Sequence, residues 1–367
     1  MRILQIIHDR ERGGVQKLAA MIEDGLSSRR FAVETAYLYP HAGLPTLAKF
    51  VYVLRTARRI WRGDFDTLIA YQSSASILVG VVGWLAGCRL RVVHQTCTPG
   101  QMPRPLRLFD KLAGTLGLYT ANIVNSAATW AEFARYPARY RRAMILIEHG
   151  LDAPAPTHNR EAARRLFNLP LSQPILLNVG RLAAQKNQDV LIRALTCLPQ
   201  AHLVLAGAGP KLDAMHTLAV TLGVDDRLHL LGALPAEDVA DLYAAADLFV
   251  FPSTWETFGL APVEAAMVGL PMVVADLAVL REVLRADGTE PVAFVAPHDT
   301  EGWISAIGKA LAAAPAARTV AAFASNISRK YSRQRMIESY LSLFEAYARP
   351  DRREVAGLQT TAEEARP

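Results

Sequence analysis

Two glutamates, Glu256 and Glu264, flank a glycine turn and the start of an apolar helix in the segment WETFGLAPVEAAMVGLP. The preceding LFVFP is typical of a buried strand, so the turn leaves the carboxyl end of that strand. Pro262 is tolerated in the first turn of a helix, where we also expect Glu264, and Glu256 then lies in the loop. The N–H groups ahead of a helix bind anions, and a carboxylate beside them accepts hydrogen bonds from hydroxyls such as a ribose diol.

The alternative interpretation is that Glu264 only complements its helix dipole and that Glu256 is a solvated loop acid. A second segment, NVGRLAAQKN (178–187), favours a binding site. Arg181 follows the glycine that ends a predicted strand, and Lys186 lies five residues further on, near a helix start. Two cations at the same sheet edge would stabilise the charge that a nucleoside diphosphate gains when its bond to a sugar breaks. Together the segments predict a nucleotide-sugar site.

Three other motifs are less specific. Gly13 and Gly14 begin a helix after the first strand, so their N–H groups can meet a phosphate or let an acceptor approach closely. The segment GAGP (207–210) lacks the third glycine and the distal acid expected for dinucleotide binding. The segment DFD (64–66) matches a metal-binding DxD pattern, but it falls at a helix-to-strand junction, where we interpret the acids as structural.

The elements that must position these residues are clearest in the second half. Short apolar runs end at residues 180, 207, 232, 252, 275 and 296, and each precedes a helical pattern. Continuous apolar strands that alternate with helices indicate a parallel sheet covered on both faces. Ligands of such sheets bind at the carboxyl ends of the strands.

The first half repeats this pattern more loosely, with strands expected at ILQII, VETAYLY, TLIAY, RVVHQ and NIVNS. The longest apolar run, residues 75–88, is too short to cross a membrane and predicts a buried helix. A boundary rich in proline and polar residues falls near 149–159. We therefore predict an α/β protein with two Rossmann-like, doubly wound parallel-sheet domains facing a central cleft. The domains are residues 1–152 and 153–330, a helix at 331–349 packs back on the first domain, and the tail 350–367 is disordered.

Composition separates the two halves. Residues 1–152 contain 20 Lys and Arg against 11 Asp and Glu, whereas the rest contains 20 against 23, which together give the net charge of +6. The basic half, with clusters at 55–62 and 135–142, predicts contact with an anionic surface or substrate, although solvated helix faces would look the same. Cys88, Cys97 and Cys197 form no CxxC pair and have no ligand-spaced histidine, so we expect no metal site, no disulfide and a cytoplasmic protein.

Several segments resemble the large retaining glycosyltransferase family 4, which has the GT-B fold. The resemblance is carried by NVGRLAAQKNQDVLIRAL, LVLAGAGP, LHLLGALPAEDVADLYAAADLFVFPSTWETFGLAPVEAAMVGLPMV and YSRQRMIESY. It covers essentially the whole chain after residue 150, whereas the first half matches only in GGVQKLA and in its general layout. The resemblance implies transfer of a hexose with retention of configuration, by front-face attack in which the leaving phosphate takes the acceptor proton, without a metal or cofactor.

The same resemblance implies a role for each site residue. Arg181 and Lys186 would neutralise the donor diphosphate. Glu264 would bind the ribose hydroxyls, and Glu256 would contact the donor sugar near the reacting centre. The backbone at Phe258, Gly259 and Leu260 would hold phosphate and sugar, and Gly14 would line the donor phosphate and the acceptor.

Two positions depart from the family pattern. Many members carry a histidine after the fourth strand that contacts the donor sugar, and His94 in RVVHQTCTPG is the nearest candidate, either as that catalytic histidine or as a structural residue. The usual asparagine before glycine at the domain junction is replaced by His149.

The sequence thus predicts a cytoplasmic enzyme that transfers a hexose from a UDP- or GDP-sugar to a glycan or lipid-linked glycan, as in the synthesis of cell-surface polysaccharides. The basic first domain would face the acceptor and contact an anionic membrane peripherally. A sugar-nucleotide epimerase of the same fold would need no acceptor, and a phosphorylase would need pyridoxal phosphate and a much longer chain. A nucleic-acid-binding protein would fit the isoelectric point of 9.3, but the chain shows no recognition motif.

Overall fold

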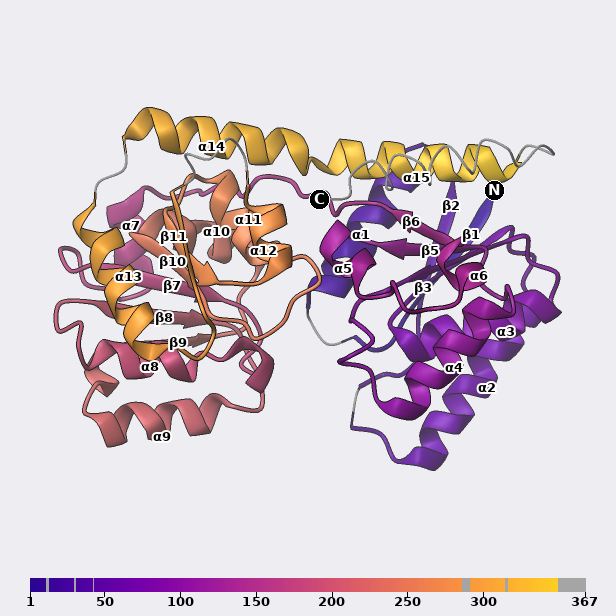
Figure 1. Cartoon of the computed structure of the whole chain (residues 1–367), viewed down its shortest axis with the longest axis horizontal. Helices are drawn as coiled ribbons and strands as arrows, with labels where there is room; N and C mark the ends of the chain where they lie inside the picture. The colour runs from indigo at the N-terminus through magenta and orange to yellow at the C-terminus, as the bar shows by residue number, and fades with distance from the viewer. Residues whose placement is uncertain (11–12, 30, 42, 286–290, 314–315, 349–367) are drawn as a thin grey trace. The chain divides into compact units, whose positions relative to one another are not determined.

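The computed structural model describes residues 1–10, 13–29, 31–41, 43–285, 291–313 and 316–348 (Figure 1). The chain divides into two compact units, Met1–Gly150 with Arg333–Pro367, and Leu151–Ser332. These divisions lie two residues from the predicted boundaries at 152 and 330. The tail predicted to be disordered, 350–367, lies outside the described residues.

The first unit is built on a six-stranded parallel sheet with the strand order β2-β1-β3-β4-β5-β6. Its strands are β1 (Arg2–Ile7), β2 (Ala32–Tyr37), β3 (Thr67–Tyr71), β4 (Leu90–His94), β5 (Ala121–Val124) and β6 (Met144–Leu146). Its helices are α1 (Gly14–Ser27), α2 (Thr46–Arg62), α3 (Ser73–Leu85), α4 (Arg104–Thr115), α5 (Ala127–Ala131), α6 (Ala138–Arg141) and α15 (Arg333–Ala348). The sequence missed β6, because a three-residue strand is too short to show a periodic pattern.

The second unit has the same construction, with the strand order β12-β11-β10-β7-β8-β9, again all parallel. Its strands are β7 (Ile175–Val179), β8 (His202–Ala206), β9 (Leu228–Gly232), β10 (Leu248–Phe251), β11 (Met272–Ala275) and β12 (Val292–Val295). Its α-helices are α7 (Arg160–Leu166), α8 (Asp189–Leu195), α9 (Leu212–Leu222), α10 (Ala236–Ala245), α11 (Leu260–Met267), α12 (Ala278–Val283), α13 (Thr300–Ala312) and α14 (Ala317–Lys330), and its 3-10 turns are η1 (Ala184–Lys186) and η2 (Asp225–Arg227). The prediction of two doubly wound sheets is confirmed.

Helix α15 follows the second unit in sequence but packs on the first. The Tyr347 hydroxyl bonds to the Thr120 carbonyl, and Arg333 pairs with Asp24 on α1. The rings of Phe344 and Phe31 lie 5.8 Å apart. The last helix therefore belongs to the first unit.

The exposure of helix α3 differs from the prediction. Residues 75–88 were expected to form a buried helix, and the segment does form most of α3, but Val81, Trp84 and Leu85 are exposed. A helix that covers only one face of a sheet leaves its opposite side outward, whatever the residues there. No helix among the described residues is long and apolar enough to cross a membrane.

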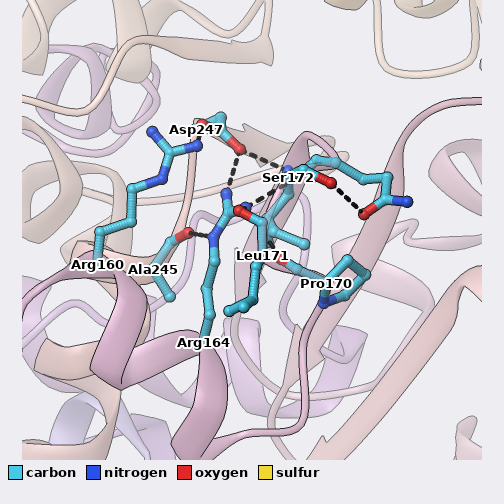
Figure 2. A network of polar contacts seen from close by, with 9 residues as sticks. Arg160, Arg164, Pro170, Leu171, Ser172, Ala245 and Asp247 are labelled. Atoms are coloured by element: carbon cyan, nitrogen blue, oxygen red, sulfur yellow. Dashed lines mark hydrogen bonds and ion pairs between the residues drawn. The ribbon is translucent and has the colours of Figure 1, made fainter.

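A buried arginine joins the amino ends of two central strands of the second unit (Figure 2). The Arg164 guanidinium, on α7, donates to the carbonyls of Ala245, Pro170, Leu171 and Gln173. It also pairs with Asp247 at 2.6 Å, and Asp247 accepts the Ile175 N–H at 2.7 Å. This network ties α7 and its following loop to the starts of β7 and β10.

Candidate functional site

The predicted site residues of the second unit gather where the strand order reverses. β7 and β10 are neighbours in the sheet, but the chain continues from β7 to β8 on one side and from β10 to β11 on the other. Loops that leave such a pair in opposite directions open a crevice at the carboxyl ends of the strands. Arg181 and Lys186 follow β7, whereas Glu256 and Glu264 follow β10.

Close backbone packing shapes the loop after β7. The Gly180 N–H bonds to the Ala206 carbonyl, and the Leu182 N–H bonds to the Ala208 carbonyl. A Cβ on Gly207 would lie 1.9 Å from the Gly180 oxygen, and one on Gly209 would lie 2.1 Å from the Leu182 oxygen. The two glycines of GAGP thus let the loops after β7 and β8 touch, and this contact explains the motif without a dinucleotide.

Hydrogen bonds also join the loops after β7 and β10. The Gln185 carbonyl accepts from the Thr254 N–H at 2.8 Å and from its hydroxyl at 3.1 Å. The Gln185 amide donates to the Trp255 carbonyl at 2.9 Å. These bonds fix the positions of the segments that carry Lys186 and Glu256 relative to each other.

Lys186 and Glu256 form an ion pair at this junction. Both side chains are largely buried, and the Lys186 ammonium also lies 4.8 Å from the centre of the Phe251 ring. An ammonium has three donors, so Lys186 can hold Glu256 and still donate to a phosphate oxygen. Arg181 is exposed at the same edge. The sequence predicted these residues but not their pairing.

Helix α11 begins at Leu260, directly after the glycine turn. Gly259 has φ +89°, and a Cβ there would come within 2.9 Å of Leu280, so the turn requires glycine. Glu264 is the fifth residue of α11 and therefore lies in its second turn, not in the first turn as expected. The buried Phe258 ring packs edge-on against Tyr331, so the Phe258 side chain is occupied in the core.

Tyr243 is a partner of Glu264 that the sequence did not indicate. Glu264 is only 6% exposed, and its carboxylate accepts the Tyr243 hydroxyl at 2.9 Å. Burial, followed by the adjacent Glu264 carboxylate, holds the pKa of Tyr243 well above its usual value. Tyr243 therefore stays a donor that orients one oxygen of Glu264.

Asn178 is a polar residue inside the apolar strand β7. Its amide nitrogen donates to the Val250 carbonyl at 2.7 Å, and its oxygen accepts from Gln188. Gln188 also donates to the Arg181 carbonyl at 3.2 Å. A buried polar residue in an otherwise apolar strand was a sequence signal for this network, which supports the backbone beside Arg181.

The remaining predicted site residues, Gly14 and His94, lie in the first unit. Gly14 begins α1 after β1, where the predicted glycine pair is found. His94 ends β4 but is buried, and its Nε2 lies 3.1 Å from the Tyr340 hydroxyl of α15. His149 is buried too, with its Nε2 2.9 Å from the Asn125 amide. This burial favours the structural alternative for His94, and the donor contacts of Gly14 and His94 stay predictions.

The two buried histidines make the stability of the first unit depend on pH. Burial lowers the pKa of His94 from 6.5 to about 3, with His149 as a second cause, and burial lowers the pKa of His149 to about 4. Below about pH 6.5 these histidines therefore bind protons in the unfolded chain but stay neutral in the folded chain. We expect the free energy of unfolding to be highest above that pH and to fall by about 1.4 kcal/mol per pH unit for each histidine between pH 6.5 and 4.

Urea denaturation at pH 7, 6 and 5 measures this slope. His94→Gln should reduce it to about half, because His149 remains, whereas His216→Gln, at an exposed position on α9, should leave it unchanged. Equal slopes in the two variants would show that His94 does not carry the effect.

Residues 159–326, which hold the whole β7–β10 site, match the family model described as glycosyl transferases group 1. The D-inositol 3-phosphate glycosyltransferase of Xylanimonas cellulosilytica is 30% identical over 307 residues, which cover 76% of this chain and 72% of that protein. The chain belongs to the group 1 glycosyltransferases. The D-inositol 3-phosphate glycosyltransferase of Mycolicibacterium smegmatis is 33% identical over 285 residues, or 72% of this chain, but the match spans only 65% of the relative's own length.

Solved structures show the same fold at lower identity. Anabaena HepE in complex with UDP-glucose has a TM-score of 0.79 at 19% identity, with 94% of this chain and 100% of that chain covered. Sucrose-phosphate synthase of Thermosynechococcus elongatus has a TM-score of 0.78 at 20% identity, with coverage of 94% and 98%. The predicted GT-B architecture is confirmed, and the epimerase and nucleic-acid alternatives are not favoured.

Proposed function

We propose that this glycosyltransferase moves a hexose, with retention of configuration, from a UDP- or GDP-sugar to a glycan or lipid-linked glycan. One observation carries the proposal: two cations, two acids and the start of α11 meet at the carboxyl ends of β7 and β10. A nucleotide sugar carries the complementary groups, namely a diphosphate, a ribose diol and sugar hydroxyls. The inositol phosphate named for the curated relatives also marks a polyhydroxylated, anionic acceptor as a candidate.

The cations would act on the leaving group. The bond from the anomeric carbon to the diphosphate oxygen breaks, and the acceptor oxygen bonds to the same face of that carbon. The acceptor proton passes to the departing phosphate oxygen, so no protein base is needed. Lys186 and Arg181 would stabilise the charge that remains on the diphosphate, and the first N–H groups of α11 would add to it.

The acids would orient the donor. Glu264, with one oxygen fixed by Tyr243, would accept both ribose hydroxyls, which are neutral donors suited to a buried carboxylate. Glu256 would contact the hexose beside the reacting carbon while it holds Lys186. The first unit, which has the basic sequence and Gly14 at the start of α1, would bind the acceptor, and its basic surface would contact an anionic membrane.

Donor binding can be tested through thermal stability. We expect one family of nucleotide sugars in a UDP-, GDP- and ADP-sugar panel to raise the melting temperature by several degrees, because a ligand at 100 times its Kd stabilises the fold by about 2.7 kcal/mol. Glu264→Gln should lose most of this shift. The control Glu237→Gln, an exposed acid of α10, should keep it.

Three outcomes would contradict the proposal. An equal shift in both variants would place the nucleotide elsewhere. An inverted anomeric centre in the product, read by proton NMR, would exclude retention. An epimerised sugar formed from donor alone would indicate that the protein is an epimerase.

A further inference from the structure

Helix α2 carries an apolar stripe on its outward side. Leu47, Phe50, Leu54 and Trp61 recur at helical spacing, and all are exposed, Leu47 by 77% and Trp61 by 61%. The opposite side of the helix, which includes Ile60, is buried against the unit. Such a stripe usually faces a core, so its position here requires an explanation.

Helices α3 and α4 extend the same kind of surface. On α4, Leu108, Phe109, Leu112 and Leu116 are exposed at successive intervals of one, three and four residues, which places them on one side of the helix and its C-cap. On α3, Trp84 and Leu85 are exposed. α3 packs against both α2 and α4, and the three helices lie together in Figure 1. We call their exposed side chains the three-helix face.

The charge on these helices is of one sign. They carry Lys49, Arg55, Arg58, Arg59, Arg62, Arg104, Arg107 and Lys111, and their one acid, Asp110, is fully buried. Arg59 is neutralised by Glu34, but Arg58 and Arg62 are exposed at the edge of the α2 stripe. Two copies of such a surface would repel each other, whereas anionic lipid headgroups complement it.

We propose that the three-helix face lies in the interface of an anionic lipid bilayer, with its aromatic and aliphatic side chains among the acyl chains and its arginines at the headgroups. A helix with an apolar side and flanking cations binds membranes in this way, and single-sided charge alone gives only weak attachment. The inference deepens the proposed function, on which it rests for the lipid-linked acceptor, by naming the surface that would meet the membrane.

Flotation of the full-length chain with vesicles tests the proposal without any donor, so a failure here is separate from a failure of the proposed transfer. We expect binding to phosphatidylcholine vesicles that contain 30% phosphatidylglycerol, and weak binding to pure phosphatidylcholine. Arg58→Gln with Arg62→Gln should weaken binding about 30-fold, because each basic residue near an anionic surface contributes about fivefold. Phe50→Ser with Leu54→Ser should weaken it at least about tenfold.

Matched controls come from the second unit. Arg193→Gln with Arg318→Gln removes two exposed cations, and Leu166→Ser with Val220→Ser removes two exposed apolar side chains. Both control pairs should bind as the unchanged protein does. The thermal shift that the nucleotide sugar produces should be the same in every variant, since the three-helix face contains none of the proposed donor site.

The fluorescence of the two exposed tryptophans, Trp61 and Trp84, shows directly whether the three-helix face enters the bilayer. Lipids brominated in their acyl chains should quench the protein's fluorescence, and Trp61→Phe with Trp84→Phe should abolish that quenching. The proposal is overturned by no vesicle binding, by equal binding to neutral vesicles, or by binding that the face variants leave intact. The protein could instead form a dimer in the absence of lipid. If Phe50→Ser with Leu54→Ser dissociated such a dimer, the face would be a protein interface and the proposal would be overturned.

Discussion

Lys186→Ala is expected to lower kcat for sugar transfer by about 10²–10³-fold, the usual effect of removing one fixed donor from a developing negative charge. Lys186 is held in place by Glu256 and by the Phe251 ring, so its ammonium needs little reorganisation when the diphosphate departs. The loss should fall mainly on kcat and less on the KM of the donor, because the charge grows as the bond breaks. Steady-state transfer with the donor that stabilises the protein best measures both constants.

Lys211→Ala is the matched control for this experiment. Lys211 also forms an ion pair, with Asp189, but it lies outside the predicted site and is more exposed. Its variant should retain transfer within about twofold, because Lys211 and Asp189 form a partly exposed pair away from the predicted site. Both variants should have native circular dichroism. If the Lys186 variant then transferred sugar as fast as the Lys211 variant, Lys186 would have no role in the mechanism.

Arg164→Leu is expected to reduce the free energy of unfolding of the second unit by about 3–5 kcal/mol, because it leaves the Asp247 carboxylate without its buried partner. The Arg164 side chain is 1% exposed, and its five donated hydrogen bonds include four to backbone carbonyls that the variant would leave unsatisfied. Urea denaturation gives the total loss. Amide hydrogen exchange at Ile175, which donates to Asp247, shows whether the loss is centred on β7.

Arg160→Leu supplies the comparison. Arg160 pairs with the other oxygen of Asp247, but its side chain is 56% exposed, so its removal should cost less than about 1 kcal/mol. Equal losses in the two variants would mean that burial of Arg164 does not set the strength of the network. Since the network lies at the amino ends of the strands, opposite the predicted donor site, neither change should alter the KM of the donor.

The fold was largely predictable because each strand is a short apolar run followed by a helical pattern. Of the twelve strands in the described part of the chain, eleven could be placed in this way, and β6 was missed because three residues carry no period. The grouping of Arg181, Lys186, Glu256 and Glu264 was predictable for a related reason. Each follows a strand, and the carboxyl ends of parallel strands meet at one edge.

The sequence by itself determined which residue types stand at the ends of β7 and β10, since chain order and periodicity are local properties. Only the tertiary structure decided which groups pair. The Lys186–Glu256 ion pair, the Tyr243–Glu264 hydrogen bond and the contact of His94 with Tyr340 join segments that lie between 21 and 246 positions apart. It also decided that Trp84 faces outward on a helix whose sequence predicts burial. Burial and side-chain partners depend on packing between distant elements, and no local pattern encodes that packing.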